Sequence, residues 1–429
     1  EFFTLQWHYS IMDLPTAWDV TVGDPSRVAA VVDTGVLYDH PDFENTDGSS
    51  RIISHGADLI DDPSVSLDGD GRDGDGYDDG DNECGDGCNS YHGTHVSGTI
   101  GAATDNGTDV AGVTWAGSIL PVRVLGAGGG AVADIADGIE WAVGNSVDGV
   151  SDNPTPADVI NMSLGGSGQS QVMDDAVHDA VGTGCIVVVA AGNDNIDATN
   201  STPANSPDAI VVAAHGNVGP DQATPKKSSY SNFGDKVDIA APGGEQAEDL
   251  DGDGQGDGVL STLGKQSGGK VDFDVEYYQG TSMATPHVAG VAMLLKSLDP
   301  TLDQEAVRSI LKQSASKDLD CPEGCGAGRL SAAAAVTLQT KGSLDGTVIA
   351  SPSFLRVGKG QTETPVVFKD LGSKGATVSF AVGGADRGKC AIDSEGGAVD
   401  AGGQIVTTVT ITRNGAADDS GEWDKSEEH

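Results

Sequence analysis

Short, continuous apolar runs rich in β-branched residues alternate with segments of helical periodicity between residues 28 and 214. Such runs are typical of strands buried on both faces, which are parallel strands, and the intervening helices would make the crossovers. We therefore predict an α/β fold, with a doubly wound, mostly parallel sheet flanked by helices. The expected strands are 28–32, 119–125, 159–164, 185–191 and 210–214, and the expected helices between them are 92–103, 133–143 and 172–181.

The composition changes near residue 340. Before it, 302–316 and 328–338 are expected to be helical. After it come short alternating segments separated by turn residues, which predict antiparallel strands. We expect three parts: a main domain over 1–340, a small β-sandwich-like all-β module over 341–417, and a disordered, charged tail over 418–429.

Acidic residues dominate the chain, with 66 Asp and Glu against 23 Lys and Arg and a formal net charge of −43. This charge argues against nucleic acid and anionic membranes as partners, because no basic surface is available to neutralise phosphates. Two explanations of the acidity remain open. The carboxylates bind cations, or they keep the surface soluble, as in salt-rich habitats.

The expected compartment is extracellular. No apolar run reaches about 18 residues, so no transmembrane helix is predicted. The first residues lack the basic and apolar regions of a signal peptide, which suggests a processed mature form. The same four-residue cysteine spacing occurs in Cys84–Cys88 and Cys321–Cys325. Two local disulfides are favoured, and a four-cysteine zinc site is the alternative. Cys185, in an apolar run, is expected to be a buried free thiol, and Cys390 has no assigned partner.

Chemistry-bearing side chains lie where such a sheet would place a site. Asp33 and Asn193 lie at or just past the ends of expected strands, and ligands bind at the carboxyl ends of parallel strands. Ser282 opens an apolar helical segment, where free N–H groups and the helix dipole favour developing negative charge. A serine becomes a nucleophile only when a base takes its proton and a carboxylate orients that base, and His92 and Asp33 would supply the pair. Asn193 could donate to an oxyanion.

Each residue also has an ordinary structural explanation. Ser282 could be a helix N-cap, Asp33 a turn aspartate, and Asn193 a cap or turn residue. His92 and His95 could ligate a metal, although no carboxylate lies near them in the expected helix. The joint occurrence of all these residues on one strand–helix alternation favours catalysis.

These stretches resemble the subtilisin-like serine proteases (subtilases). The resemblance covers about residues 5 to 340. It is carried by residues 31–36 (VVDTGV), 92–100 (HGTHVSGTI) and 280–290 (GTSMATPHVAG), with 124–127 (VLGA), 139–142 (IEWA), 161–166 (NMSLGG) and 190–193 (AAGN). The N-terminal stretches 6–9 (QWHY) and 14–19 (LPTAWD) further resemble extracellular serine proteases of Gram-negative bacteria within that family.

The resemblance implies that Asp33, His92 and Ser282 form the triad, and that Asn193 and the Ser282 N–H form the oxyanion hole. It also implies a substrate cleft, with an edge strand at 126–130 that pairs with the substrate backbone. The substrate-binding residues implied are Gly126, Gly128, Ser163, Leu164, Gly165 and Gly192. Thr285 departs from the alanine common in the family, and the 128–130 glycines leave the subsite shape open. Relatives often carry a cysteine near position 127; this chain has Ala127, which supports a Cys84–Cys88 bridge.

Calcium is the expected cofactor. Alternating aspartates and glycines place hard oxygen ligands on one side of a turning loop, and a solvated acidic loop is the alternative. The 249–257 loop resembles the start of an EF-hand loop, but Leu260 replaces its bidentate glutamate. Two acidic insertions interrupt the strand–helix pattern, a first one at 61–90 and a second one at 245–258. The candidate ligands are Asp68, Asp70, Asp73, Asp75 and Asp78 in the first insertion, and Asp249, Asp251, Asp253 and Asp257 in the second. The resemblance adds Asp42, Asp105 and Asn106.

The sequence therefore predicts a secreted, calcium-stabilised serine endopeptidase of broad specificity that works through an acyl-enzyme. Its expected partners are protein or peptide substrates and a removed propeptide, and it is expected to be a monomer. A calcium-dependent binding protein on a protease scaffold is the competing hypothesis, which an intact triad disfavours.

Overall fold

The computed structural model describes residues 2–83, 85, 88–219, 224–267 and 270–344, together with six strands between residues 348 and 411. The chain divides into two units, Glu1–Leu344 and Asp345–His429. The first unit includes the whole of α9 (Ala332–Lys341), so it ends slightly later than the expected boundary at residue 340. The predicted tail at 418–429 lies outside the described residues.

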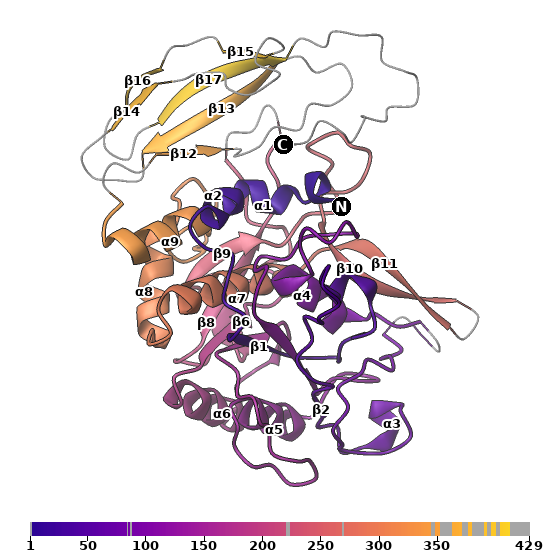
Figure 1. Cartoon of the computed structure of the whole chain (residues 1–429). Helices are drawn as coiled ribbons and strands as arrows, with labels where there is room; N and C mark the ends of the chain where they lie inside the picture. Colours follow the sequence, from indigo (N-terminus) through magenta and orange to yellow (C-terminus); the bar gives the residue numbers. More distant parts are fainter. Residues whose placement is uncertain are drawn as a thin grey trace. The chain divides into compact units, whose positions relative to one another are not determined.

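A seven-stranded sheet forms the centre of the first unit (Figure 1), in the order β2-β3-β1-β4-β6-β8-β9. All the neighbouring strands in this sheet are parallel. This confirms the predicted doubly wound α/β fold. The strands are β1 (Val28–Asp33), β2 (Ala57–Asp58), β3 (Ser118–Arg123), β4 (Val159–Met162), β6 (Ile186–Ala190), β8 (Ile210–His215) and β9 (Ile239–Pro242).

Helices cover both faces of the sheet. Helices α5 and α6 pack on one face, and α4 and α7 lie on the other, with α8, α9 and the short N-terminal helices beside them (Figure 1). Their bounds are α1 (Trp7–Ile11), α2 (Leu14–Trp18), α3 (Pro63–Ser66), α4 (His92–Gly101), α5 (Val132–Ala142), α6 (Gln171–Gly182), α7 (Thr281–Leu298) and α8 (Gln304–Ser314).

The apolar runs are continuous because successive residues of one strand enter two different cores. In β1, Ala29 and Val31 pack into the core under α4 and α7, whereas Ala30 and Val32 pack into the core under α5 and α6. A strand with a solvent-exposed face would have alternated with polar residues. Burial on both faces is therefore the physical reason that the periodicity identified these strands.

A long hairpin next to α4 was not predicted. Strands β10 (Val259–Ser267) and β11 (Lys270–Tyr278) pair in antiparallel register. The hairpin packs so closely on α4 that a Cβ on Gly98 would lie 2.2 Å from Thr262 Oγ1. The smaller two-stranded pairing of β5 (Gly166–Ser167) with β7 (Ser201–Thr202) was also not predicted. The two strands of the hairpin are consecutive in the chain, so the alternation of residues 271–278 (VDFDVEYY) was a local signal for it. The pairing of β5 with β7 instead joins separate segments, which sequence periodicity does not report.

The second unit contains antiparallel strands in two sheets, one ordered β12-β13-β17-β15 and one pairing β14 with β16. The β-sandwich-like arrangement expected for this unit stays a prediction. The strands are β12 (Val348–Ser351), β13 (Glu363–Asp370), β14 (Ala376–Ser379), β15 (Cys390–Ile392), β16 (Gly396–Val399) and β17 (Gln404–Ile411).

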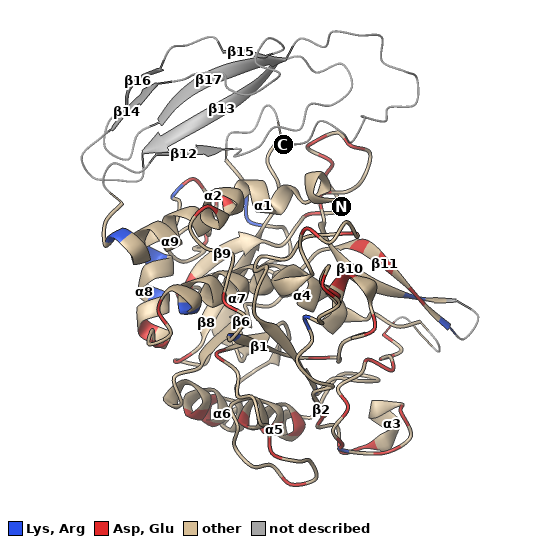
Figure 2. Ribbon diagram, in the orientation of Figure 1, with Lys and Arg blue, Asp and Glu red and all other residues tan. Residues whose placement is uncertain are grey.

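Several of the few cations are buried and bind backbone carbonyls, while acidic residues are spread over the ribbon of the first unit (Figure 2). Arg51 donates to the carbonyl oxygens of three separate residues at 2.6–3.0 Å. Lys296, in α7, is 5% exposed and donates to three carbonyl oxygens at 3.0–3.3 Å. These cations therefore tie loops together inside the protein.

A pair of buried imidazoles joins the N-terminal arm to α7. His8 Nδ1 and His287 Nε2 are 2.8 Å apart, and His287 Nδ1 lies 2.8 Å from Met283 O. Both side chains are fully buried. Burial lowers the pKa of His287 to about 3 and holds that of His8 well below its ordinary range, with the charge of the neighbouring histidine acting in the same direction on His8.

We predict that stability falls as the pH drops below about 6.5, where the histidines of the unfolded chain take up protons that the folded state refuses. The loss should continue toward pH 3, the folded-state pKa of His287. His287→Gln should reduce the slope of unfolding free energy against pH by up to one proton, about 1.4 kcal/mol per pH unit. Urea unfolding at a series of pH values measures this slope. The exposed His178 provides the control His178→Gln, which should leave the slope between pH 4 and 6 almost unchanged, and an unaltered slope in His287→Gln would contradict the assignment.

Candidate active site

Strand β1 and helix α4 bring Asp33 and His92 together. Asp33 is the last residue of β1 and is fully buried, and His92 is the first residue of α4. His92 Nδ1 lies 2.7 Å from Asp33 Oδ1, which also accepts from Thr34 N at 2.8 Å. A Cβ on Gly93 would lie 2.2 Å from Gly35 O, so a glycine is needed for α4 to begin this close to the strand. The two residues thus form the carboxylate–imidazole pair of the expected triad.

The Asp33 carboxylate sets the protonation of His92. Burial alone would lower the pKa of His92, but the charge of Asp33 and its hydrogen bond raise it by more, and the net pKa lies above 6.5. Asp33 can thus orient the ring and stabilise an imidazolium. Asp33 Oδ2 is buried and has no hydrogen-bond partner among the described residues.

A second carboxylate supports this pair from the first acidic insertion. Asp78 Oδ2 accepts from Thr34 Oγ1 at 2.6 Å, and the same hydroxyl accepts from Gly93 N at 3.0 Å. Asp78 Oδ1 accepts from Gly80 N at 3.0 Å, and burial raises the pKa of Asp78 to about 7. Asp78 was predicted as a calcium ligand. In the folded chain each of its oxygens accepts a hydrogen bond from a protein donor, because the loop folds against the beginning of α4.

Helix α7 places Ser282 in its first turn, and the hydroxyl faces β4. Ser282 Oγ donates to Ser163 O at 3.0 Å, and Ser163 Oγ donates to Ser282 O at 2.7 Å. Within the described part of the chain, no hydrogen bond joins Ser282 to His92. In this structure the Ser282 hydroxyl is turned toward Ser163, the residue after β4. Rotation about χ1 of Ser282 would free the hydroxyl from Ser163 O.

In the side-chain amide of Asn193, the oxygen is held by hydrogen bonds and the nitrogen is free. Its Oδ1 accepts from Thr281 N and from Thr281 Oγ1, each at 2.9 Å. Its Nδ2 has no hydrogen-bond partner among the described residues, and the side chain is exposed. A Cβ placed on Gly280 would lie 3.5 Å from Ser282 N and 3.6 Å from Asn193 Nδ2. Both nitrogens therefore lie close to one point, and both residues line the same cavity, as a pair of oxyanion donors would.

A cavity of about 260 Å³ opens beside Ser282. Leu164, Gly165 and Gly192 line it as expected for substrate-binding residues, together with Asn193. Ser163 does not line the cavity but holds Ser282 from the side. Gly166, which ends the 161–166 motif that the resemblance implies for the cleft, lines it too. The lining residues that sequence reasoning missed are Ser167, Ala190, Ala191, Asp194, Ser201, Thr202 and Thr281. Several of them adjoin named motifs, whereas Ser201 and Thr202 enter only through the unpredicted pairing of β5 with β7.

The stretch expected to form a substrate-pairing edge strand is a tight turn. Gly126 and Gly129 exchange both backbone hydrogen bonds, at 2.9 and 3.0 Å. Gly128 (φ +81°) and Gly129 (φ +105°) adopt conformations that favour glycine, which allow the turn. The Gly126 N–H is therefore engaged within the turn, and neither Gly126 nor Gly128 lines the cavity.

Arg123 occupies the centre of the first acidic insertion. It is fully buried, and its Nη1 donates to Asp58 Oδ2 at 2.6 Å and to Asp68 Oδ2 at 2.8 Å. Asp75 Oδ1 accepts from Tyr77 N and from the Tyr38 hydroxyl, each at 3.1 Å. In the described structure, the five predicted ligands of this insertion do not gather into one cluster. The group of carboxylates that is close enough together to hold a metal ion comes from the second insertion.

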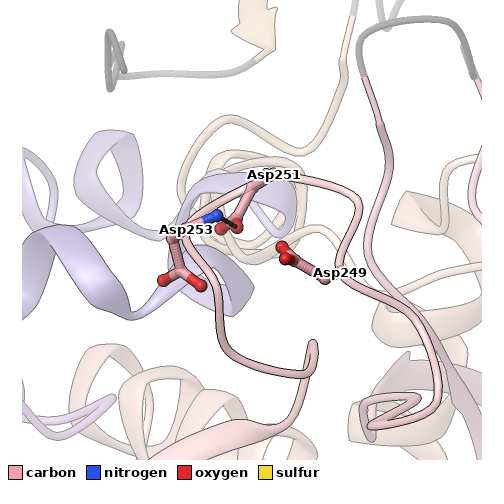
Figure 3. A group of neighbouring side chains, drawn as sticks. All are labelled: Asp249, Asp251 and Asp253. Carbon is pink, nitrogen blue, oxygen red and sulfur yellow. Dashed lines mark hydrogen bonds between the residues drawn. The ribbon is translucent and has the colours of Figure 1, made fainter. Parts of the chain in front are cut away.

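That cluster consists of Asp249, Asp251 and Asp253. One carboxylate oxygen of each lies within 4.8 Å of the others (Figure 3). The set offers the hard oxygen ligands that calcium prefers, so it fits the ion. Asp257 does not join it, because its oxygens accept from Asn217 Nδ2 at 2.9 Å and from Leu250 N at 2.7 Å.

At the third predicted calcium site, Asp42 is buried and accepts from Asn106 Nδ2 at 3.0 Å and from Val110 N at 2.9 Å. The structure therefore brings Asp42 and Asn106 together. Asp105 is exposed at a positive φ of 61°.

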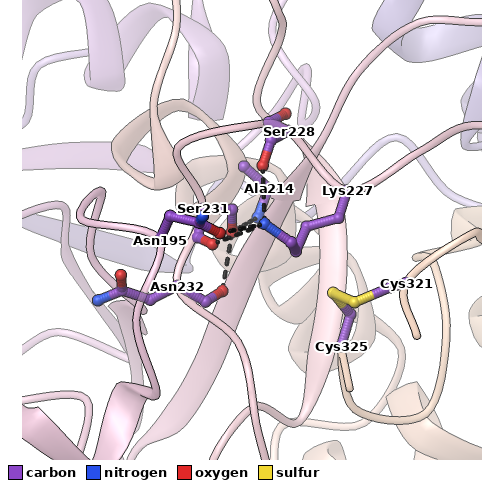
Figure 4. Close-up of a disulfide and its surroundings, with 8 residues drawn as sticks. All are labelled: Asn195, Ala214, Lys227, Ser228, Ser231, Asn232, Cys321 and Cys325. Atoms are coloured by element: carbon purple, nitrogen blue, oxygen red, sulfur yellow. Dashed lines mark hydrogen bonds between the residues drawn. A yellow bond between two sulfur atoms is a disulfide. The ribbon is translucent and has the colours of Figure 1, made fainter. Parts of the chain in front are cut away.

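The cysteines follow the predicted pattern where they are described. Cys321 and Cys325 form a disulfide (Figure 4), and Cys185 is a buried free thiol whose pKa burial raises. Cys88 is disulfide-bonded, while Cys84 lies outside the described residues, as does the side chain of Cys390.

We predict that His92 titrates with a midpoint above 6.5 and that Asp33→Asn lowers this midpoint. The substitution removes the charge that raises the pKa but leaves the burial that lowers it. NMR titration of the imidazole resonances measures both midpoints. His178, an exposed histidine 2.8 Å from Asp208, serves as an internal control and should not move. Equal midpoints for His92 in the two proteins would refute the pairing.

Comparison with known proteins identifies the family. Residues 26–328 match the model of the subtilase family. An extracellular protease of Xanthomonas campestris pv. campestris is 43% identical over 354 residues, which cover 79% of this chain and 56% of that protein. An extracellular basic protease of Dichelobacter nodosus is 36% identical over 356 residues, covering 77% and 54%.

A solved structure titled as proteases from Pseudoalteromonas arctica PAMC 21717 is 44% identical, with a TM-score of 0.70, and the match covers 79% of this chain and 98% of that one. The chain spans little more than half the length of the two curated relatives. These matches confirm the resemblance inferred from the motifs. The chain belongs to the subtilase family.

Proposed function

We propose that this protein is a secreted serine endopeptidase with Ser282 as nucleophile, His92 as general base and Asp33 as its orienting carboxylate. The observation that carries the proposal is the 2.7 Å contact between Asp33 and His92. The cavity lined by both Ser282 and Asn193 supports it. The names of the extracellular relatives support the activity and the location. None of the helices in the described part of the chain has the length and apolar character of a bilayer-spanning segment.

In the proposed mechanism, Ser282 Oγ leaves Ser163 O, turns toward His92 Nε2 and attacks the scissile carbonyl carbon as His92 accepts its proton. Asp33 accepts the Nδ1–H of His92 and stabilises the imidazolium. The oxyanion accepts from Asn193 Nδ2 and Ser282 N. His92 then protonates the leaving amine, and a water activated by the same histidine hydrolyses the acyl-enzyme.

The 260 Å³ cavity would hold the side chain that precedes the scissile bond. Its walls are mainly backbone and small side chains, which leaves room for many residues and supports broad specificity. Protein and peptide substrates, a removed propeptide and a monomeric state belong to the same proposal.

We predict that Ser282→Ala abolishes peptide hydrolysis and labelling by a serine-directed phosphonate. Hydrolysis of casein and of a chromogenic peptide provides the measurement. Ser297 lies on the same helix, where its hydroxyl donates to Met293 O at 2.7 Å far from the triad, so Ser297→Ala is the matched control and should keep full activity. Undiminished hydrolysis by Ser282→Ala would exclude the proposed nucleophile.

We further propose that calcium binds at Asp249, Asp251 and Asp253, where it would neutralise three clustered carboxylates and stabilise the loop. Removal of the ion with EDTA should lower the melting temperature, because calcium at about 100 times its dissociation constant adds about 2.7 kcal/mol to stability.

The calcium measurement is best made in the Ser282→Ala background, where self-digestion cannot contribute. In that background, Asp251→Asn should remove most of the response to EDTA. Asp47 is an exposed turn aspartate that accepts from Ser49 N at 2.9 Å, so Asp47→Asn should keep the full response. A melting curve that EDTA does not change would reject calcium here.

A further inference from the structure

A buried amide group organises the chain on both sides of Asn193. We propose that Asn232 is a positioning residue that holds the segment 191–196, and through it the Asn193 side chain, in the geometry that binds the oxyanion. The inference rests on the proposed function, in which Asn193 Nδ2 is an oxyanion donor. Asn232 lies between β8 and β9, far from Asn193 in sequence, and neither belongs to the expected triad nor lines the cavity.

The side chain of Asn232 uses its complete hydrogen-bonding capacity. Asn232 is fully buried. Its Oδ1 accepts from Asp194 N and from Ile196 N, each at 3.0 Å. Its Nδ2 donates to Ala191 O at 2.8 Å and to Ser201 Oγ at 3.0 Å. A carboxamide offers two donors and two acceptor positions, and all four are engaged here.

The orientation of this amide is fixed by its partners. Backbone N–H groups can only donate and a backbone carbonyl can only accept, so the oxygen must face Asp194 and Ile196, and the nitrogen must face Ala191. Neither an aspartate nor a leucine of similar size can satisfy the same four groups. The position therefore requires an asparagine for hydrogen bonding and not only for packing.

The contacts of Asn232 lie on both sides of Asn193. The side chain binds Ala191 before it and Asp194 and Ile196 after it, and Asn232 N donates to Gly192 O at 2.9 Å. A Cβ on Gly192, which has φ +103°, would lie 2.4 Å from Asn232 Nδ2, so the amide packs directly against this backbone.

Asn193 itself points out of this frame toward α7. Its Oδ1 accepts from Thr281, the residue before the nucleophile, and Gly192 N donates to Thr281 Oγ1 at 3.1 Å. Asn232 thus fixes the backbone and Thr281 fixes the oxygen of the Asn193 amide, which leaves Nδ2 unengaged beside the cavity that Asn193 and Ser282 both line.

The segment that carries Asn232 is anchored to the rigid sheet. Ser231 Oγ accepts from Ala214 N of β8 at 2.9 Å and donates to Asn232 O at 2.9 Å. Lys227 Nζ donates to Ser231 O at 3.1 Å and to Asn195 Oδ1 at 2.8 Å, so it ties the two segments together a second time (Figure 4). The amide therefore transmits the position of β8 to the oxyanion segment.

The expected size of the effect follows from how sharply catalysis depends on geometry. Loss of one oxyanion donor costs about 10²–10³ in kcat, and a displacement of about 1 Å can cost about 10². Asn232→Asp keeps the size of the side chain but turns an acceptor toward Ala191 O. We expect kcat to fall about 10- to 100-fold.

A double-mutant cycle with Asn193→Ala tests the proposal, because a residue that acts only through Asn193 has nothing left to position once that side chain is gone. Asn193→Ala should lower kcat about 10²- to 10³-fold. Adding Asn232→Asp to it should lower kcat by less than about 2-fold further, although melting temperatures should fall equally in both backgrounds. If Asn232→Asp does not fold, Ser231→Ala replaces it, because this change removes the hydroxyl that links Asn232 O to Ala214 N and does not touch the cavity. It should have a smaller effect on kcat, and again almost none in the Asn193→Ala background.

Asn153 provides the matched control. It is buried, its Nδ2 donates to Trp141 O at 3.2 Å and to Ala142 O at 3.0 Å, and its Oδ1 accepts from Thr155 N at 2.9 Å, away from the site. Asn153→Asp should lower the melting temperature and leave kcat within about 2-fold.

The outcomes separate the two proposals. Equal, multiplicative losses from Asn232→Asp in both backgrounds, or an unchanged kcat in the wild-type background, would overturn the positioning role alone. An Asn193→Ala variant with unchanged kcat would instead remove the oxyanion role on which the inference rests.

Discussion

The burial of parallel strands on both faces is the constraint on which the rest of this structure depends. Strands that run in the same direction between two helical layers must all end at one edge, and the backbone groups there are the first that can leave the core. Asp33, Ser163 and Asn193 lie at or after the ends of β1, β4 and β6, which are neighbours in the sheet. The buried helix α7 packs over the same strands and brings Ser282 to this edge. The site is thus a consequence of the strand order.

The sequence predicted the strands and site residues that depend on the pattern of neighbouring residues. The strand periodicity identified β1, β4, β6 and β8, and the residues at their ends identified Asp33 and Asn193. Interactions between distant segments left no such signal. Asn232 belongs to an irregular segment, and only the folded chain shows that its amide bridges residues on both sides of Asn193. The same holds for the pairing of β5 with β7 and for the contact of Ser282 Oγ with Ser163 O.

The first acidic insertion is linked to the sheet through a buried guanidinium. Arg123 binds Asp68 of the insertion and Asp58 of β2, while calcium binding by the alternating aspartates stays a prediction. Burial raises the pKa of Asp58 to about 7 even though Arg123 opposes the shift. Arg123 stands next to Asp33 in the register of β3 with β1, so its ion pairs attach the insertion to the strands beside Asp33.

The internal cations have a consequence for the chemical reactivity of this protein. Amine reagents such as acylating agents and aldehydes attack the neutral, solvent-accessible form of a lysine side chain. In Lys296 the ammonium is enclosed and its three protons are each directed at a carbonyl oxygen. A reagent can reach this nitrogen only after the turn that follows α7 has opened. The rate at which Lys296 is modified therefore reports how often the chain opens at the far end of α7, the helix that carries Ser282 in its first turn.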